Sequence, residues 1–452
     1  LFSIFNEVEA VFTVSSQAGF EALIAGKKVY VFGKPFYAGW GLTADNKKVR
    51  RRKARLNLKQ LVAAALVIYP RYIDPYTGKL TTVENTLELI AWLKQKYRRH
   101  TKYYHCAGFK NWQKDYMNNV LSAPGNEVFF YHSPFRAIGD AVRSGGKVVI
   151  NSIINNDEIT YNAAKRGVDI INADDGFIRS IGLPSTYSSP SSVILDDLGI
   201  YYKAGLESRV ERILENIEID ELHKQRVTKL ISLINGYSIA KYNYKASPLR
   251  LAFPNDKNLI LVAGQIENDA SIVKTRSKIR TNLRLLEYTR AKNPDSYIIY
   301  KPHPEVVSGR KIGHIPKKIA QKYSDFIIEN ISTPDLIKRC DEVYTISSNI
   351  GFEALIRGKK VFTAGSPFYA GWGLTTDLLK FKRRTRKLSL EELVYGCLIL
   401  YPMYFDHSAN LPCRVEQVIQ KIVTQYKEMK IAEEISFNKL PFISKLLTHL
   451  ID

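Results

Sequence analysis

Two adjacent carboxylates followed by an arginine are the side chains in this chain best suited to covalent or acid–base chemistry. Asp174 and Asp175 directly follow a short apolar run, Gly176 frees the backbone after them, and Arg179 lies a few residues further on. A carboxylate beside a cation can act as a nucleophile or as a base. The same residues also fit a plain turn with a surface salt bridge, and their spacing alone does not choose between the two interpretations.

A second group of residues fits the binding of an anionic ligand. Lys301 and His303 stand in the sequence KPHP, in which two prolines stiffen the loop and remove backbone donors. This arrangement favours a small cationic site made by the ammonium and the imidazole. Gly264 and Gln265 begin the sequence GQIEND, where the backbone either approaches a ligand closely or simply turns.

A pair of serines before a short predicted helix provides the third candidate. Ser347 and Ser348 precede a helix expected over residues 350–356, so hydroxyl and free backbone N–H groups meet at a helix N-terminus that suits phosphate. Glu353 lies about one turn into this helix, where its carboxylate can accept hydrogen bonds from ribose hydroxyls. An ordinary helix cap with a solvated glutamate is the alternative interpretation.

All of these candidates stand at the ends of predicted strands. Apolar runs alternate with amphipathic stretches, which predicts parallel α/β sheets. In a first half we expect strands at residues 128–131, 147–150 and 169–171 and helices at 135–144 and 160–166, after a loop and a helix over 105–124. In a second half we expect strands at residues 259–263, 297–300, 326–328, 342–346 and 361–363 and a helix around 272–290. Ligands bind at the carboxyl ends of such strands, so a cleft between two facing Rossmann-like halves is the expected site.

The chain also contains an internal repeat. Residues 15–43 and 347–375 are identical at 22 of 29 positions, at a constant offset of 332 residues, and the register continues into a tail expected to be helical. A long α/β segment precedes the second copy only. We therefore expect residues 1–100 to be the C-terminal part of a first, truncated module, with residues 101–245 and 246–452 forming the catalytic and nucleotide-binding halves of a second module. Any chemistry of this chain then belongs to the second module.

Composition excludes several classes of protein. A net charge of +22 with 45% hydrophobic residues describes a globular chain with a basic surface. The four cysteines lack CxxC spacing, which indicates a reducing compartment, and we assign no metal site. The basic runs at residues 47–55 and 380–387 lack the interleaved aromatic residues of a base-stacking platform, so nucleic acid is not an expected partner. Two interpretations of these basic runs remain: a solvated face of the protein, or a face that contacts an anionic membrane surface.

Four motifs, in order, resemble those of bacterial capsule polysaccharide proteins of the KpsC/LipB type: DDGFIRSIGL, GQIENDASI, KPHPEV, and SSNIGFEALIRGKKV with PFYAGWGLT. The resemblance covers nearly the whole chain, including the repeat. It implies a GT-B-like fold and a retaining β-Kdo transferase that builds the Kdo linker between lyso-phosphatidylglycerol and a capsular polysaccharide. The implied donor is CMP-β-Kdo, the implied acceptor is a growing Kdo oligosaccharide on a lipid, and no further cofactor is expected.

The resemblance also assigns roles to single residues. It places His303, Ser347 and Ser348 on the CMP moiety. Asp175 keeps the position of the family's expected nucleophile, whereas Asp174 stands where the family usually has Glu. Retention at the anomeric carbon requires two inversions, and a carboxylate opposite the departing CMP provides the first.

Together these expectations describe a cytoplasmic transferase that is peripheral to the inner membrane and contacts its anionic surface and possible partner proteins of capsule assembly. The departing nucleotide is a phosphate of low pKa that needs no protonation, so Lys301, His303 and the serine helix terminus can stabilise it without a divalent metal. Two alternatives stay open. One is a non-catalytic sugar- or lipid-binding component of capsule export, and the other is a transferase for another CMP-activated acid such as sialic acid.

Overall fold

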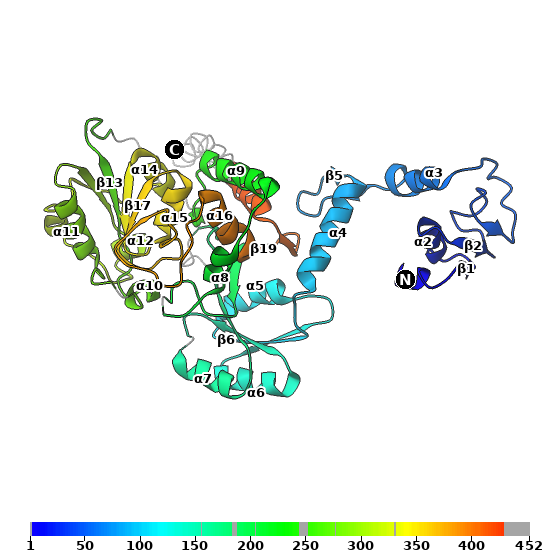
Figure 1. Ribbon diagram of the computed structural model, residues 1–452, viewed down its shortest axis with the longest axis horizontal. Helices are drawn as coiled ribbons and strands as arrows, with labels where there is room; N and C mark the ends of the chain where they lie inside the picture. The colour runs from blue at the N-terminus through cyan, green and yellow to red at the C-terminus, as the bar shows by residue number, and fades with distance from the viewer. Residues whose placement is uncertain are drawn as a thin grey trace, which may run out of the picture. The chain divides into compact units, whose positions relative to one another are not determined.

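The computed structural model describes residues 2–154, 156–182, 188–203, 205–243, 252–275, 277–329 and 331–428 (Figure 1). The chain divides into two compact units, Leu1–Lys96 and Tyr97–Asp452. All of the candidate site residues lie in the second unit, which contains two α/β halves.

The first half of the second unit is built on a sheet that has seven strands among the described residues, in the order β20-β19-β11-β9-β8-β6-β7. Its parallel part consists of β6 (Tyr103–Ala107), β7 (Glu127–Tyr131), β8 (Lys147–Asn151) and β9 (Ile170–Asp175). Antiparallel pairing extends it through β11 (Ser192–Asp196), β19 (Pro402–Asp406) and β20 (Leu411–Cys413). The C-terminal part of the chain therefore returns to complete the sheet of the first half.

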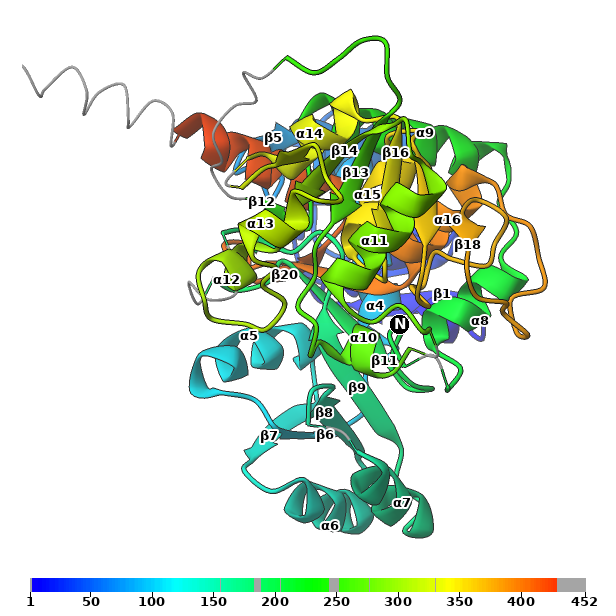
Figure 2. The ribbon, with the colours of Figure 1, turned by 90° about the vertical axis from the view of Figure 1, so that its left-hand side faces the viewer.

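Helices cover both faces of this sheet. One face packs against α5 (Asn111–Leu121), and the other against α6 (Pro134–Ser144) and α7 (Asp157–Lys165). Figure 2 shows α6 and α7 side by side at the end of the sheet away from the second half. The side chains of β6 and β8 alternate between these two apolar clusters, as the period of two in a strand requires.

The second half contains a parallel sheet with the order β15-β14-β13-β16-β17-β18 over the described part of the chain. Its strands are β13 (Leu259–Ala263), β14 (Tyr297–Lys301), β15 (Phe326–Ile327), β16 (Glu342–Thr345), β17 (Lys360–Thr363) and β18 (Thr376–Asp377). Its connections include the helices α10 (Ala270–Val273), α11 (Asn282–Lys292), α12 (Pro304–Val307), α14 (Thr333–Arg339) and α15 (Asn349–Ile356). Every residue of the inner strand β13 is buried, because helices cover both faces of a parallel sheet.

The strands expected from apolar runs are confirmed, and four expectations are wrong in detail. Residues 103–107, in part expected to be a loop, form β6. The helix expected around residues 272–290 is two helices, α10 and α11, because the Thr281 side chain caps a new helix start by accepting from the backbone N–H of Arg284. The tail expected to be helical contains β19 and β20. Asp174 and Asp175 belong to strand β9 instead of a turn after it.

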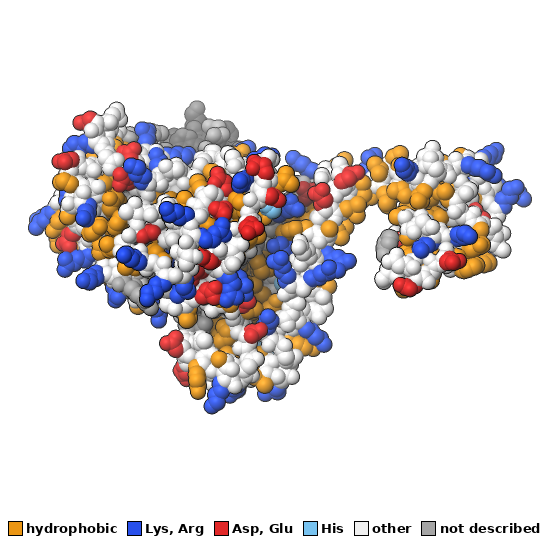
Figure 3. Space-filling model, in the orientation of Figure 1, with side chains coloured by type: hydrophobic (Ala, Val, Ile, Leu, Met, Phe, Trp, Pro, Cys, Tyr) orange, Lys and Arg blue, Asp and Glu red, His pale blue; other side chains and the backbone are white. Residues whose placement is uncertain are grey.

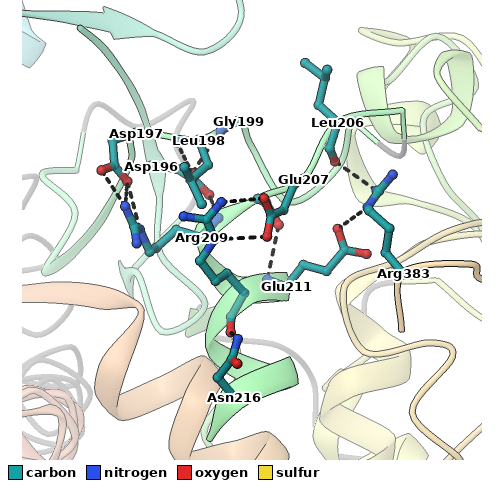
Figure 4. A network of polar contacts seen from close by, with 12 residues as sticks. Asp196, Asp197, Leu198, Gly199, Leu206, Glu207, Arg209, Glu211, Asn216 and Arg383 are labelled. Carbon is teal, nitrogen blue, oxygen red and sulfur yellow. Dashed lines mark hydrogen bonds and ion pairs between the residues drawn. The ribbon is translucent and has the colours of Figure 1, made fainter. Parts of the chain in front are cut away.

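The two halves of the second unit are joined by a buried ion pair. Glu211 of α8 (Arg209–Asn216) accepts from Arg383 at 3.0 Å (Figure 4). It also accepts from Arg384 at 3.1 Å, and the side chains of Glu211 and Arg384 are only 7% and 6% exposed. Arg384 also donates to the carbonyl groups of Pro367 and Ala370, at 2.6 Å each. Part of the basic run at residues 380–387 thus holds the fold together.

The first unit repeats the end of the second. Its strands β1 (Ala10–Thr13), β2 (Lys28–Val31) and β3 (Ala44–Asp45) and its helix α2 (Ala18–Ile24) correspond to β16, β17, β18 and α15. Helix α3 (Leu58–Val62) continues into a π-helical turn, as does its counterpart α16 (Leu390–Val394). Single contacts recur as well. Arg52 donates to the carbonyl groups of Pro35 and Ala38 and lies over the Trp40 ring. Arg384 makes the same contacts with Pro367, Ala370 and Trp372.

Figure 3 shows one face of the second unit, on which Lys and Arg side chains are spread over both halves. Asp and Glu side chains lie among them, and no single basic patch dominates this face. Among the described residues, no helix has the length and apolar character needed to cross a membrane.

Replacing Glu211 by Ala should lower the free energy of unfolding by about 3 kcal/mol, because it leaves the buried Arg384 guanidinium without its carboxylate. Glu207→Ala is the matched control, since Glu207 pairs with Arg212 where the two side chains are 40% and 46% exposed. The control should change the unfolding free energy by less than about 1 kcal/mol. Urea unfolding of both variants measures the difference, and equal effects would contradict the proposed importance of the buried pair.

Candidate functional site

Asp174 and Asp175 lie at the carboxyl end of β9, where the neighbouring strand β11 fixes their backbone. They pair in antiparallel register with Ile194 and Val193. Successive residues of a strand point to opposite faces, so the two carboxylates meet different surroundings. Gly176 follows because a Cβ there would come within 2.2 Å of the Ser192 hydroxyl.

Asp175 forms an ion pair with a buried arginine. Its Oδ2 accepts from Arg179 Nε at 2.5 Å, and the Asp175 side chain is 23% exposed while that of Arg179 is fully buried. The Nη1 of Arg179 donates to the hydroxyls of Ser180 and Ser188 at 2.8 and 3.0 Å. The interpretation as a surface salt bridge is therefore wrong, since the guanidinium does not reach solvent.

Asp174 has a different electrostatic environment. Burial raises its pKa to about 6, Lys241 opposes this shift, and the neighbouring charge of Asp175 adds to it. Its Oδ1 accepts from the backbone N–H of Asp175 at 2.7 Å. A carboxyl group that titrates near neutral pH can take up or release a proton during a reaction.

Lys241 and a group of tyrosines complete the surroundings of these carboxylates. Lys241 directly precedes β12 (Tyr242–Asn243), which pairs with β10 (Ser180–Ile181), and its carbonyl accepts from the backbone N–H of Arg179 at 3.0 Å. Burial raises the pKa of Tyr116 and of Tyr242, and the charges of both aspartates and of Arg179 also act on the pKa of each phenol. None of these residues stands in a recognisable motif, so local sequence patterns did not indicate them.

On the second half, the side chain of Gln265 organises the serine motif. Its Oε1 accepts from the backbone N–H of Ser347 at 2.8 Å and from the hydroxyl of Thr345 at 3.2 Å, and its Nε2 lies 3.4 Å from the Ser347 hydroxyl. The Ser347 hydroxyl also donates to Ser271 at 3.0 Å. Gly264 allows the close approach of two strand ends, since a Cβ there would lie 2.9 Å from the Cα of Pro302. The structure thus brings Gly264, Gln265 and Ser347 together.

Ser348 begins helix α15 as its N-cap. Its hydroxyl accepts from the backbone N–H of Ile350 at 3.2 Å, and its carbonyl accepts from the hydroxyl of the buried Tyr369 at 2.5 Å. Gly351 is required beside this tyrosine, because a Cβ there would lie 2.2 Å from the Tyr369 hydroxyl. The PFYAGW loop therefore packs against the start of the helix and fixes its position.

Lys301 is the last residue of β14, and His303 follows it at the same edge of the sheet. Lys301 is 3% exposed, and burial lowers its pKa while Glu353 opposes the shift. The Nδ1 of His303 accepts from the backbone N–H of Glu305 at 3.2 Å, which leaves the ring proton on Nε2. Burial lowers the pKa of His303 and favours its neutral form. In this structure the lysine supplies the charge of the expected cationic site, and the histidine supplies a neutral donor.

Glu353 links the second half of this unit to the first half. Its Oε1 accepts from the backbone N–H of Lys241 at 2.9 Å and from Nδ2 of Asn349 at 3.2 Å, and burial raises its pKa. It was expected to face ribose hydroxyls, whereas the structure places it against the other half. The described residues contain no group of His, Cys, Asp and Glu that could hold a metal ion.

Comparison with known proteins agrees with this architecture. The sequence model of the family described as "Capsule polysaccharide biosynthesis protein" matches residues 1–72, 155–246 and 237–407. The capsule polysaccharide modification protein LipA of Neisseria meningitidis serogroup B is 38% identical over 434 residues, which are 95% of this chain and 61% of that protein. The lipopolysaccharide-processing protein LpsZ of Rhizobium meliloti is 37% identical over 267 residues, 58% of this chain and 60% of that protein. This chain thus spans about three fifths of LipA.

Two solved structures of KpsC from Thermosulfurimonas dismutans share the fold. The one described as a β-Kdo 2,7 transferase is 33% identical and has a TM-score of 0.59. The match covers 72% of this chain and 100% of the KpsC chain. The one described as a β-Kdo 2,4 transferase is 27% identical with a TM-score of 0.62, and covers 72% and 99%.

Two halves with parallel sheets therefore define an α/β protein with the fold of the KpsC Kdo transferases. The chain belongs to the capsule polysaccharide biosynthesis protein family, which confirms the resemblance seen in its motifs.

Asp174→Asn should stabilise the protein more at pH 8 than at pH 4. The folded-state pKa of Asp174 is about 6, above the ordinary value of 3.8. The wild-type protein therefore loses unfolding free energy as the pH rises from about 4 to 6, because the carboxyl ionises less readily in the folded state than in the unfolded state. Asparagine cannot ionise, so the variant should gain about 3 kcal/mol relative to wild type across this pH range. Urea unfolding at both pH values measures the gain, with Asp197→Asn on the exposed Arg209 pair as the control. A gain that is the same at pH 4 and pH 8 would contradict the buried, perturbed carboxyl.

Proposed function

We propose that this chain contains a GT-B-like, retaining β-Kdo transferase module that transfers Kdo from CMP-β-Kdo to a Kdo-bearing lipid acceptor in capsule polysaccharide biosynthesis. The observation that carries the proposal is the Asp175–Arg179 pair at the end of β9, connected through Lys241 and Glu353 to a phosphate-suited helix terminus. The two KpsC structures described as β-Kdo transferases support the same chemistry.

In the proposed reaction Asp175 is the nucleophile. Its carboxylate attacks the anomeric carbon while the bond from that carbon to the CMP phosphate oxygen breaks, which gives an ester with inverted configuration. An acceptor hydroxyl then attacks the same carbon, the ester bond breaks, and the second inversion restores the configuration of the donor. The proton of that hydroxyl passes to a general base, and we assign this role to Asp174 because its pKa of about 6 suits proton uptake near neutral pH.

The departing CMP is stabilised by the nucleotide half. The ammonium of Lys301 supplies positive charge, and the Nε2–H of His303 supplies a hydrogen-bond donor. The N-terminus of α15, held by Gln265 and Tyr369, adds backbone N–H groups and hydroxyls near the developing phosphate charge. These groups are preorganised, so little reorganisation is needed when charge appears on the leaving group.

A lipid-linked acceptor places the enzyme at an anionic membrane surface, as proposed from the sequence. In the second unit this role falls to the exposed Lys380, Lys382 and Lys387, because Arg383, Arg384 and Arg386 make ion pairs or carbonyl contacts within the fold. Two alternatives remain: a non-catalytic component of capsule export, and a transferase of another CMP-activated acid. The following experiments distinguish them from the proposal.

His303→Ala should weaken the binding of CMP by about 1.5–3 kcal/mol, or roughly tenfold to hundredfold, because the imidazole donor to a charged phosphate is lost. Calorimetry with CMP measures the change. His223→Ala, on the helix α9 (Glu221–Gly236) of the first half, is the control and should bind CMP like the wild type. Undiminished CMP binding by the His303 variant would show that the nucleotide site is misplaced.

Asp175→Asn should retain CMP binding and lose nearly all transfer, since the amide keeps the shape but is a poor nucleophile. Incubation of the wild type with CMP-β-Kdo and no acceptor, followed by digestion and mass spectrometry, should give a peptide containing Asp175 that is heavier by one Kdo residue. Asp197→Asn serves as the control carboxylate outside the site. An active Asp175 variant, or an adduct on another residue, would remove Asp175 from the nucleophile role.

A further inference from the structure

A segment with basic charge of one sign follows His303 directly. It runs from α12 to α13 (Lys317–Ala320), and residues 306–324 contain no Asp or Glu. The basic side chains of this segment are all exposed: Arg310, Lys311, Lys317, Lys318 and Lys322. The proposed reaction gives none of them a role.

Apolar side chains stand exposed among these charges. Ile312 is 62% exposed, and Val307 and Ile319 are 37% exposed each. A single exposed apolar residue is common on any protein surface. Several of them within a short segment that is otherwise basic form a pattern typical of surfaces that lie in the headgroup layer of an anionic bilayer.

The fold holds the backbone of this segment in place. Ile315 packs into the apolar core of the second half. The carbonyl of Ile312 accepts from the backbone N–H of Glu267 at 3.0 Å, and the carbonyl of Gly313 accepts from Nδ2 of Asn282 at 2.9 Å. The exposed Ile312 side chain is therefore displayed by a loop whose backbone is bound to the fold beneath it.

The same contacts connect the segment to the candidate site. Nδ2 of Asn282 also donates to the carbonyl of Gln265, and Oδ1 of Asn282 accepts from the backbone N–H of Gln265, both at 2.8 Å. Gln265 in turn organises Ser347. A membrane contact made by this segment would therefore hold the nucleotide side of the site close to the bilayer that carries a lipid-linked acceptor.

The segment lies apart from the basic run at residues 380–387. Helices α12 and α13 connect β14 to β15 at one end of the strand order, whereas the run follows β18 at the other end. Figure 2 shows α12 and α13 on the left of the second half and β18 on its right. The two surfaces are separate, so a probe placed in the α12–α13 segment reports on that segment alone.

We propose that the α12–α13 segment is a docking surface for an anionic lipid bilayer, with Ile312 inserted among the headgroups and the basic side chains on the lipid phosphates. The charge and the apolar side chains together complement a layer that is negative at its surface and apolar beneath. This proposal rests on the proposed function, because it assigns a membrane contact to an enzyme that uses a lipid-linked acceptor. The charged contacts should weaken as salt rises, whereas the insertion of Ile312 should not.

A fluorescent probe tests the insertion. All four cysteines of the chain are buried, so one thiol introduced at the surface can be labelled selectively. An environment-sensitive dye on Ile312→Cys should shift its emission to the blue on vesicles of equal parts phosphatidylglycerol and phosphatidylcholine. Leu222→Cys on α9, where Leu222 is 75% exposed, is the matched control and should show no shift. Vesicle binding with no shift at position 312, equal shifts at both positions, or no vesicle binding would each overturn the proposal.

Charge reversal tests the basic side chains. Lys317→Glu with Lys318→Glu should lower partitioning of the full chain onto these vesicles roughly tenfold or more. Lys224→Glu with Lys229→Glu changes the net charge equally on the exposed face of α9 and should lower it far less. Equal losses would show that net charge alone governs binding and would overturn the docking surface.

Calorimetry with CMP keeps this proposal apart from the proposed function. The Lys317 and Lys318 double variant should bind CMP like the wild type, because neither lysine belongs to the nucleotide site. Loss of vesicle binding with intact CMP binding supports the docking surface. A wild-type chain that inserts position 312 into vesicles but binds no CMP would refute the proposed function and leave the docking surface standing.

Discussion

The hydrogen bond from the backbone of Lys241 to the buried carboxylate of Glu353 is the contact on which the candidate site depends. It lies between the two halves, and it continues on one side into the Arg179–Asp175 ion pair and on the other into helix α15. Glu353 and Arg179 are buried, so leaving either of them unpaired costs more than losing a surface contact would. The carboxylates and the phosphate-suited helix terminus are therefore held in one arrangement.

Much of the fold could be predicted because buried parallel strands appear as apolar runs. The sequence LILVA of β13 is the clearest example. The candidate residue Lys301 ends its strand, and Ser347 follows the end of another. The sequence pattern did not predict strand β6, because the strand contains a polar residue, His105. In the fold its ring nitrogens form hydrogen bonds with the hydroxyls of Tyr131 and Ser144. Satisfying a buried histidine needs partners distant in sequence, which no local pattern reveals.

Other features of the site depend on long-range pairing as well. Asp174 and Asp175 are strand residues only because β11 pairs with them, and β11 in turn pairs with β19 from the C-terminal region. Lys241 reaches the site through its ladder with the segment around Arg179. A motif shows which residue types occur together in sequence, but it cannot show a cation that arrives from a separate loop.

The internal repeat has a packing explanation that the sequence alone did not supply. In both copies a tyrosine hydroxyl donates to the carbonyl of the second serine, and a glycine in the helix makes room for that tyrosine, at Gly19 with Tyr37 and at Gly351 with Tyr369. Repetition of these residues therefore follows from the need to fix a helix start. The repetition does not by itself show whether this helix binds a ligand or is only structural. The hydrogen-bond partners of Glu353 are therefore better evidence for a role in the site than the recurrence of this glutamate.

The central claim is a double displacement at the carboxylates of β9. The most direct test is the anomeric configuration of the product formed from CMP-β-Kdo and a synthetic Kdo-lipid acceptor, determined by NMR. The account predicts a newly formed β linkage, because two inversions restore the configuration of the donor. An α-linked product would show a single inversion and contradict an enzyme-bound intermediate.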